Sequence, residues 1–180
     1  MKAVIAPFML ATVLVSSPAL AKGEKGWDTA STIGAVGLAT IAIGYPLATG
    51  DTNGALQAGG SVAASQLISF GLKEALPEWR PDRSDRKSFP SGHTAMSFAA
   101  AATLFNRQGA SAGLPALAVA TFVGVARVQA DKHHWYDCLA GAAIGSASGF
   151  LITKNRPDRQ VAFIPWGDTR SAGVSFAMRF

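Results

Sequence analysis

Stretches without a charged side chain dominate the hydrophobic pattern of this chain. Asp, Glu, Lys and Arg are all absent from 29–50, 52–72, 88–106, 108–126 and 138–153. The first four stretches are 19 to 22 residues long. A helix of that length crosses a bilayer core of about 30 Å. A soluble bundle would instead carry a charged stripe on most of its helices. The pattern therefore predicts an all-α bundle that lies in a membrane.

Turn-forming residues between these stretches delimit five core helices. The predicted ranges are 30–48, 55–76, 91–105, 112–128 and 136–153. Small residues recur at every fourth position in two of these helices, and such spacing lets membrane helices approach closely. They are Ser61, Ser65 and Ser69 in the second helix, and Gly141, Gly145 and Gly149 in the fifth.

Both ends of the chain differ from this central pattern. Residues 1–21 have a positively charged start, an apolar centre and small residues at their end, as in a secretory signal peptide. An uncleaved first membrane helix is the alternative. Residues 22–155 form the predicted helical domain, which opens with a polar lead from Lys22 to Asp28. The tail, 156–180, alternates apolar and other residues near its end and predicts a short β-hairpin.

Composition narrows the class of protein. Hydrophobic residues make up 49% of the chain and charged residues only 15%, against roughly 25% in soluble domains. The mean hydropathy is nevertheless only +0.24, so a soluble periplasmic protein remains the alternative. The net charge is +5, but basic and acidic residues are interleaved between Lys73 and Lys87, which argues against nucleic-acid binding. The single cysteine, Cys138, excludes an intrachain disulfide.

Polar residues that could take part in catalysis gather in and next to the loops after the second and fourth helices. These loops belong to the same face of an up-and-down bundle, and they hold all three histidines. The clusters are Lys73 with Arg80-Pro81, then Pro90-Ser91-Gly92-His93, then Arg127 with His133 and Asp137. We expect the three clusters to meet in one site.

The residue types in these clusters suit phosphoryl transfer. A phosphoryl group in transfer carries negative charge on three oxygens, which fixed donors must surround. Lys73, Arg80 and Arg127 supply cations, and the forked arginine donors match phosphate geometry. Ser91, a plausible N-cap, and the N–H of Gly92 add neutral donors at a helix start.

The two histidines would then divide the chemistry. His133 and Asp137, at positions i and i+4, fall on one helical face, where the carboxylate can accept from one ring nitrogen. The other nitrogen is left unprotonated and can act as a nucleophile. His93 can donate a proton to the departing alkoxide. This arrangement needs no metal, although zinc bound by the two histidines and Asp137 is an alternative.

The same residues carry a resemblance to a known family. The chain resembles the type-2 phosphatidic acid phosphatase superfamily, which includes bacterial class A acid phosphatases and vanadium haloperoxidases. The family pattern is K-x6-RP, then PSGH, then SR-x5-H-x3-D, and it is matched over about 70–150. The resemblance implies a helical bundle, a phosphohistidine intermediate on His133, and His93 as general acid. Ala126 replaces the family's serine, and His134 is expected to be a spare interface residue.

These observations predict a metal-independent phosphatase without a cofactor. The expected substrate is a lipid-linked phosphomonoester or pyrophosphate, hydrolysed at the periplasmic face of a bacterial inner membrane. Both interpretations of residues 1–21 place residue 22 outside the cytoplasm. The alternatives are a soluble periplasmic acid phosphatase, a vanadium-dependent haloperoxidase, and an inactive lipid-binding membrane protein.

Overall fold

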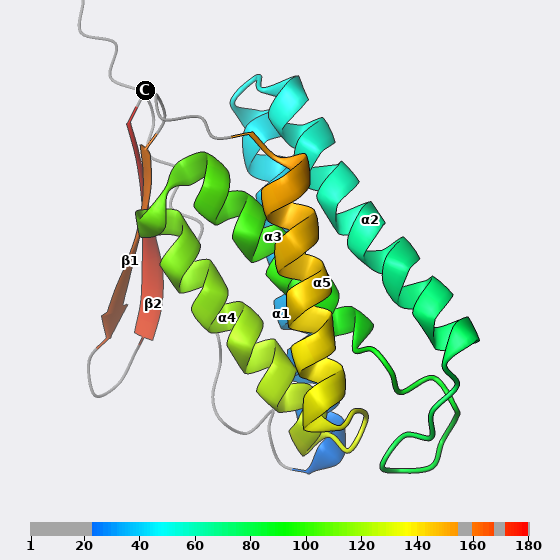
Figure 1. Ribbon diagram of the computed structural model, residues 1–180. Coiled ribbons are helices and arrows are strands. Elements are labelled where there is room, and N and C mark those ends of the chain that lie inside the picture. The colour runs from blue at the N-terminus through cyan, green and yellow to red at the C-terminus, as the bar shows by residue number, and fades with distance from the viewer. Residues whose placement is uncertain (1–22, 155–159, 168–171, 180) are drawn as a thin grey trace, which may run out of the picture.

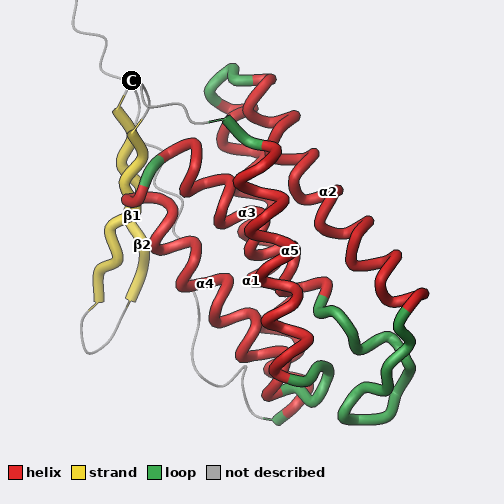
Figure 2. The backbone as a smooth tube through the Cα atoms, in the orientation of Figure 1, coloured by secondary structure: helices red, strands yellow, loops and turns green. Residues whose placement is uncertain are grey.

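Five helices and a β-hairpin make up the fold in a computed structural model, which describes residues 23–154, 160–167 and 172–179 (Figures 1 and 2). The helices are α1 (Glu24–Ala48), α2 (Thr52–Ala75), α3 (Gly92–Gln108), α4 (Ala110–Gln129) and α5 (Trp135–Ile152). The antiparallel strands β1 (Gln160–Gly167) and β2 (Ala172–Arg179) pair with Val161 opposite Met178. The hairpin lies beside α4. The predicted helical bundle with a hairpin tail is confirmed, while the predicted signal lies outside the described residues.

Helix α1 begins earlier than the sequence pattern predicted. The polar lead was expected to end at Asp28, but the helix already starts at Glu24. An acidic residue in the first turn interacts favourably with the positive end of the helix dipole. The hydroxyl of Thr32 donates to the backbone carbonyl of Asp28 at 3.0 Å and follows the helical repeat. The extra turn matters because it carries Asp28 to the end of the bundle.

Helix α5 packs on α3 through the predicted glycine face. A Cβ at Gly145 would lie 2.2 Å from the carbonyl oxygen of Ala95, and one at Gly141 would lie 2.5 Å from that of Ser91. Only glycine permits this approach of two backbones. The close packing brings the N-terminal ends of α3 and α5 together.

The predicted serine face of α2 is also buried. Ser61, Ser65 and Ser69 are almost inaccessible to solvent. The hydroxyl of Ser61 lies 2.8 Å from that of Thr103 on α3, so the two side chains form a hydrogen bond across the interface. Such bonds satisfy polar groups in a bundle interior. The prediction of close helix contact at these serines is confirmed.

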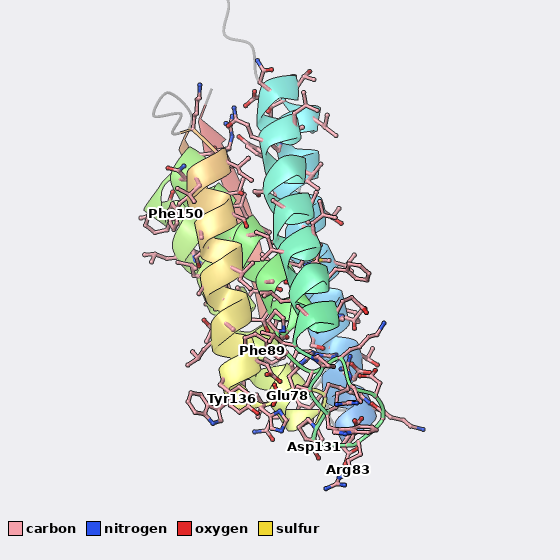
Figure 3. All side chains as sticks on the ribbon, turned by 45° about the vertical axis from the view of Figure 1, so that its right-hand side comes forward. Glu78, Arg83, Phe89, Asp131, Tyr136 and Phe150 are labelled. Atoms are coloured by element: carbon pink, nitrogen blue, oxygen red, sulfur yellow. The ribbon has the colours of Figure 1, made fainter. Side chains whose placement is uncertain are left out.

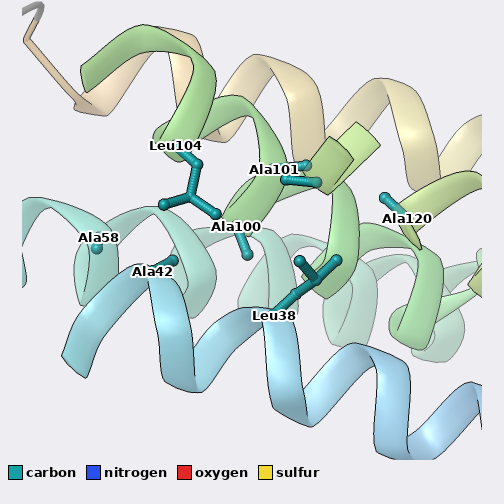
Figure 4. Close-up of a cluster of buried hydrophobic side chains, with 8 residues drawn as sticks. Leu38, Ala42, Ala58, Ala100, Ala101, Leu104 and Ala120 are labelled. Atoms are coloured by element: carbon teal, nitrogen blue, oxygen red, sulfur yellow. The ribbon is translucent and has the colours of Figure 1, made fainter. Parts of the chain in front are cut away.

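Alanine and leucine fill the centre of the bundle around α3 (Figure 4). Helix α3 contacts each of the other four helices. The drawn cluster joins Leu38 and Ala42 of α1, Ala58 of α2, Ala100, Ala101 and Leu104 of α3, and Ala120 of α4. Because these side chains are small, the helix backbones lie close to one another around the second half of α3.

Large apolar side chains lie on the outside of this small-residue interior. Leu56, Leu67 and Leu151 are 68%, 71% and 84% exposed. Helices α1 and α4 are long and apolar enough to cross a membrane, whereas the other described helices do not meet that test. The sequence prediction rested on the absence of charged residues, which this test of length and hydropathy meets in α1 and α4. Small residues inside and large apolar residues outside are typical of helices that pack within lipid.

A buried ion pair closes the end of the bundle where α3 finishes. We predicted a turn at 106–109, but α3 continues to Gln108 and only Gly109, with φ +82°, breaks the helix. Arg107 therefore points inward, where its Nη2 donates to Oδ2 of Asp51 at 2.6 Å. Both side chains are less than a tenth exposed. A Cβ at Gly54 would lie 2.5 Å from Asp51 Oδ2, so glycine leaves the room for this pair.

Candidate active site

The three polar clusters converge at one end of the bundle, where α1, α3 and α5 begin and α2 and α4 end (Figure 1). Figure 3 shows Glu78, Asp131 and Tyr136 together at this end, while Phe150 lies at the other. The loops after α2 and α4 thus share a face, as the sequence predicted.

The three predicted cations act on both motif histidines. Burial, then the positive charge of Arg127, lower the pKa of His93 to about 4; the negative charge of Asp28 opposes this, and Arg80 and Lys73 add to it. Burial also lowers the pKa of His133 to about 4, and the same three cations contribute, although Asp137 opposes them. Both rings therefore lie within reach of one group of cations. Both are neutral at pH 7 while the site is empty.

Lys73 ties the loop after α2 back onto the end of that helix. Its Nζ donates to the carbonyl oxygens of Lys87 at 2.8 Å and Ser88 at 3.3 Å, and also to that of Pro90. Burial, with the nearby charge of Arg80, lowers the pKa of Lys73 to about 8. The lysine thus has a structural role and also supplies positive charge at neutral pH.

Arg80 connects the two loops that carry the motifs. Its Nε donates to Oδ1 of Asp85 at 2.7 Å, and its Nη1 donates to the carbonyl of Lys132 at 3.1 Å. Asp85 also accepts the N–H of Lys87 at 2.8 Å. These bonds hold the guanidinium next to the segment that leads into His133.

His133 faces Asp137 from outside the helix. The sequence placed both residues on one helical face, but α5 begins at Trp135, so His133 lies in the preceding loop. Its Nδ1 is 3.6 Å from Asp137 Oδ2, an ion-pair distance that is longer than a hydrogen bond. The two groups still meet because the chain turns sharply before the helix begins.

Asp137 is a fully buried carboxylate with several donors. Its Oδ2 accepts the hydroxyl of Ser88 at 2.6 Å and the N–H of His134 at 2.8 Å. Burial alone would raise the pKa of Asp137, but these donors and His133 hold it below its usual value. The carboxylate is therefore ionised at neutral pH and able to orient the His133 ring.

The start of α3 lies against the start of α5. Ser91 caps α3, since its Oγ accepts the backbone N–H of Thr94 at 3.5 Å, and it also accepts the hydroxyl of Thr94 at 2.9 Å. The N–H of Ser91 donates to the carbonyl of Asp137 at 3.0 Å. Among the described residues, a Cβ at Gly92 would meet only Gln66 Oε1, at 3.5 Å, which leaves room beside this backbone. His93 follows, with Nε2 at 3.2 Å from the hydroxyl of Thr32 on α1.

The sequence did not identify several residues that contact the site. Ser88 stands two residues before the second cluster and binds Asp137. Asp28, on α1, forms an ion pair with Arg127. The sequence contained a feature that could have identified Asp28, because it is the last charged residue before the charge-free stretch 29–50. Nothing in the sequence marked Thr32.

Asp137 also belongs to a group of three side chains that could bind a metal ion. Ligand atoms of Glu78, His134 and Asp137 are all within 4.8 Å of one another. His134 Nδ1 is 3.5 Å from Glu78 and 3.4 Å from Asp137, and its ring stacks on Tyr136. Within the described residues this group, rather than His93 and His133 with Asp137, is the one close enough to hold a metal.

Comparison with known proteins identifies relatives of the motif-bearing region. A model of the PAP2 superfamily matches residues 54–160. The lipid A 1-phosphatase of Porphyromonas gingivalis is 38% identical over 105 residues, which cover 56% of this chain and 22% of that protein. Lipid phosphate phosphatase 1 of Arabidopsis thaliana is 43% identical over 79 residues, 36% of this chain and 24% of the relative. The chain thus matches about a quarter of the length of these relatives.

Two solved structures share the fold. Aquifex aeolicus LpxE superposes with a TM-score of 0.63 at 20% identity, covering 76% of this chain and 87% of the other. The transmembrane PAP2 type phosphatidylglycerolphosphate phosphatase of Bacillus subtilis gives a TM-score of 0.58 at 24% identity, with 78% of each chain covered. At these identities the likeness concerns the fold.

Proposed function

The chain belongs to the PAP2 superfamily, and on that premise we propose that it is a metal-independent phosphatase acting on a lipid-borne phosphate. The observation that carries the proposal is that His93 and His133 lie at the same end of the bundle as three cations, whose charges lower the pKa of both rings. A buried, ionised carboxylate stands behind one of them. Transfer of an anionic phosphoryl group requires such a combination of cations, a nucleophile and an acid.

In the first step, we assign the nucleophile to His133. Asp137 faces Nδ1, so Nε2 carries the free electron pair that attacks phosphorus. A nitrogen–phosphorus bond forms as the bond from phosphorus to the leaving oxygen breaks. His93 gives that oxygen a proton. Because His93 is neutral in the empty site, the negative charge of the bound phosphate must raise its pKa for it to serve as the acid.

In the second step, water completes the hydrolysis. His93, now neutral, takes a proton from a water molecule that attacks the phosphohistidine. The nitrogen–phosphorus bond breaks, His133 is regenerated, and inorganic phosphate leaves. Arg80 and Arg127 hold the phosphoryl oxygens in both steps, with the N–H of Gly92 as a further donor. Lys73, whose Nζ donates to three backbone carbonyls, adds positive charge. Ser91 would donate in addition to its capping role.

The proposed substrate class follows from the surface and the relatives. Large apolar side chains cover the outside of the helices, and the named relatives are lipid phosphatases. A lipid in the bilayer plane would bring its headgroup to the end of the bundle where the motifs lie. Phosphatidate, phosphatidylglycerol phosphate, undecaprenyl diphosphate and a lipid A phosphate are the candidates. We place the chain in a bacterial inner membrane with the site facing the periplasm, as the predicted signal suggests.

A substrate panel tests this function. The protein is purified in detergent and phosphate release is measured from the four lipids and from soluble phosphomonoesters. We expect a preference for lipid substrates, abolished in His133→Ala together with any acid-labile phosphoenzyme. His134→Ala is the matched control, since it removes the neighbouring imidazole.

Each alternative function has its own outcome. Equal turnover of soluble esters, with the activity released by osmotic shock alone, would favour a soluble acid phosphatase. Halide oxidation with vanadate would favour a haloperoxidase. Absence of turnover on every substrate would leave an inactive lipid-binding protein.

A further inference from the structure

Helix α1 reaches the proposed active site, although it precedes the family match at 54–160. Asp28, Ser31 and Thr32 lie at positions i, i+3 and i+4 and so share one face of the helix. Asp28 and Ser31 contact Arg127, and Thr32 contacts His93. This face therefore touches one proposed phosphate ligand and the proposed acid.

The contact with Arg127 uses only part of its guanidinium. Nη1 donates to Oδ1 of Asp28 and lies 3.3 Å from the hydroxyl of Ser31. The Nε of Arg127 is buried and has no partner among the described residues. A carboxylate presents two oxygens to a guanidinium much as a phosphate does. The carboxylate of Asp28 thus occupies an anion-binding position on Arg127, whose Nε has no acceptor among the described residues.

The carboxylate of Asp28 is less firmly held than that of Asp85, which pairs with Arg80. Asp85 also accepts the N–H of Lys87 at 2.8 Å and is built into its loop. Among the described residues, the Asp28 carboxylate receives a hydrogen bond from Arg127 alone, and its side chain is 41% exposed. Arg127, by contrast, is only 5% exposed. The arginine is enclosed by the protein, whereas the carboxylate of its partner is accessible to solvent.

We propose that Asp28 is a resident counter-anion, which neutralises Arg127 in the empty site and is displaced when a phosphate group binds. The inference rests on the proposed function, because it takes Arg127 as a phosphate ligand. A buried guanidinium without a partner is unfavourable, so the carboxylate stabilises the empty protein. The same carboxylate competes with phosphate, so it lowers affinity and assists release of the product.

Direct binding of inorganic phosphate tests this inference without relying on turnover. Calorimetry and thermal unfolding are run on the full chain in detergent, for the wild type, Asp28→Asn and Asp82→Asn. Asp82 pairs with Lys132 at 2.6 Å in the same end of the bundle, so its variant matches the change in charge. We expect Kd for phosphate to fall about tenfold or more in Asp28→Asn and by less than about twofold in Asp82→Asn. Asp28→Asn should also have a lower Tm without phosphate and a larger rise in Tm with it.

Each other outcome has a defined meaning. Unchanged or weaker phosphate binding in Asp28→Asn would overturn the inference and make Asp28 a residue that positions Arg127. A variant that folds only with phosphate present would support it, since phosphate then replaces the missing anion; failure to fold at saturating phosphate would overturn it. Tighter phosphate binding in Asp28→Asn without turnover by the wild type would overturn the enzyme proposal alone. Absence of phosphate binding in the wild type would overturn both.

Discussion

Nδ1 of His133 lies 3.6 Å from Oδ2 of Asp137, although His133 precedes the helix that carries Asp137. The carboxylate is held in place by the hydroxyl of Ser88 and the N–H of His134, whereas Nδ1 of His133 has no hydrogen-bond partner among the described residues. Closure by less than an ångström would convert the contact into a hydrogen bond. Catalytic hydrogen bonds are often long in empty sites and shorten when the substrate binds.

Replacing Asp137 with asparagine should reduce kcat strongly and leave KM nearly unchanged. The amide side chain would keep an acceptor for Ser88 but would lose the charge that stabilises a positively charged His133. Loss of the analogous orienting carboxylate in other hydrolases costs up to about 10⁴-fold in kcat, and we expect about 10²- to 10⁴-fold here. Steady-state kinetics on the best lipid substrate measure this.

Ser88→Ala provides a graded companion to that variant. It removes one donor to Asp137 and should lower kcat by about tenfold, as expected for one hydrogen bond to a charged group. Both variants should keep the wild-type affinity for inorganic phosphate. A fall in phosphate affinity with kcat intact would instead place Asp137 in binding.

His93 should matter in proportion to how poor the leaving group is. An alkoxide needs a proton as it departs, whereas a good aryl leaving group does not. His93→Ala should therefore reduce kcat/KM for alkyl phosphates far more than for aryl phosphates. Equal losses on the two substrates would contradict the assignment of His93 as the acid.

The pH dependence of the same two substrates follows from the pKa of His93. Burial and Arg127 lower this pKa to about 4, so the free enzyme holds the acid's proton mainly below pH 4. Because kcat/KM reports the free enzyme, the alkyl-to-aryl ratio should fall as pH rises from 4 towards 7. Taking the ratio largely cancels effects common to both substrates, including that of His133. In His93→Ala the ratio should become independent of pH.

Chelation should leave the rate unchanged, because in the proposed mechanism Lys73, Arg80 and Arg127 supply the positive charge at the phosphate. Vanadate, a tetrahedral anion, should inhibit. Added zinc offers a contrasting test at Glu78, His134 and Asp137. A metal there would occupy the carboxylate that faces His133, so zinc should inhibit the wild type and inhibit His134→Ala less. Loss of activity with EDTA and recovery with zinc would overturn the metal-independent mechanism.

The buried pair of Arg107 and Asp51 should dominate stability at the opposite end of the bundle. Arg107→Met removes the cation that pairs with the buried carboxylate of Asp51 and should cost about 3–5 kcal/mol of unfolding free energy. Adding Asp51→Asn removes the carboxylate charge as well and should recover part of the loss. Arg83→Met, at an exposed site in the loop after α2, should stay within about 0.5 kcal/mol of the wild type. Equilibrium unfolding in detergent measures these differences. A loss of unfolding free energy in Arg107→Met as small as that in Arg83→Met would contradict the prediction.

Local sequence information was sufficient to predict the helices and to select the residues of the candidate site. The charge-free stretches and the turn residues predicted five helices, because both signals depend only on residues that are close together in the chain. The glycines at 141, 145 and 149 and the serines at 61, 65 and 69 predicted close faces because their spacing matches the helical repeat. The motif histidines, the cations and Asp137 were recognised by type, order and separation.

Contacts between residues distant in the chain could not be derived in this way. Asp28 and Arg127 are 99 positions apart, and Ser88 and Asp137 are 49 apart. Arg107 was assigned to a turn because its burial depends on Asp51, which lies on another segment. Helical periodicity shows that a face is polar or small, but not which neighbour covers it. The sequence by itself thus determined the helices and the chemistry available at one end of the bundle. The tertiary structure decided which counter-ions and hydroxyls meet that chemistry, because helix packing sets those distances.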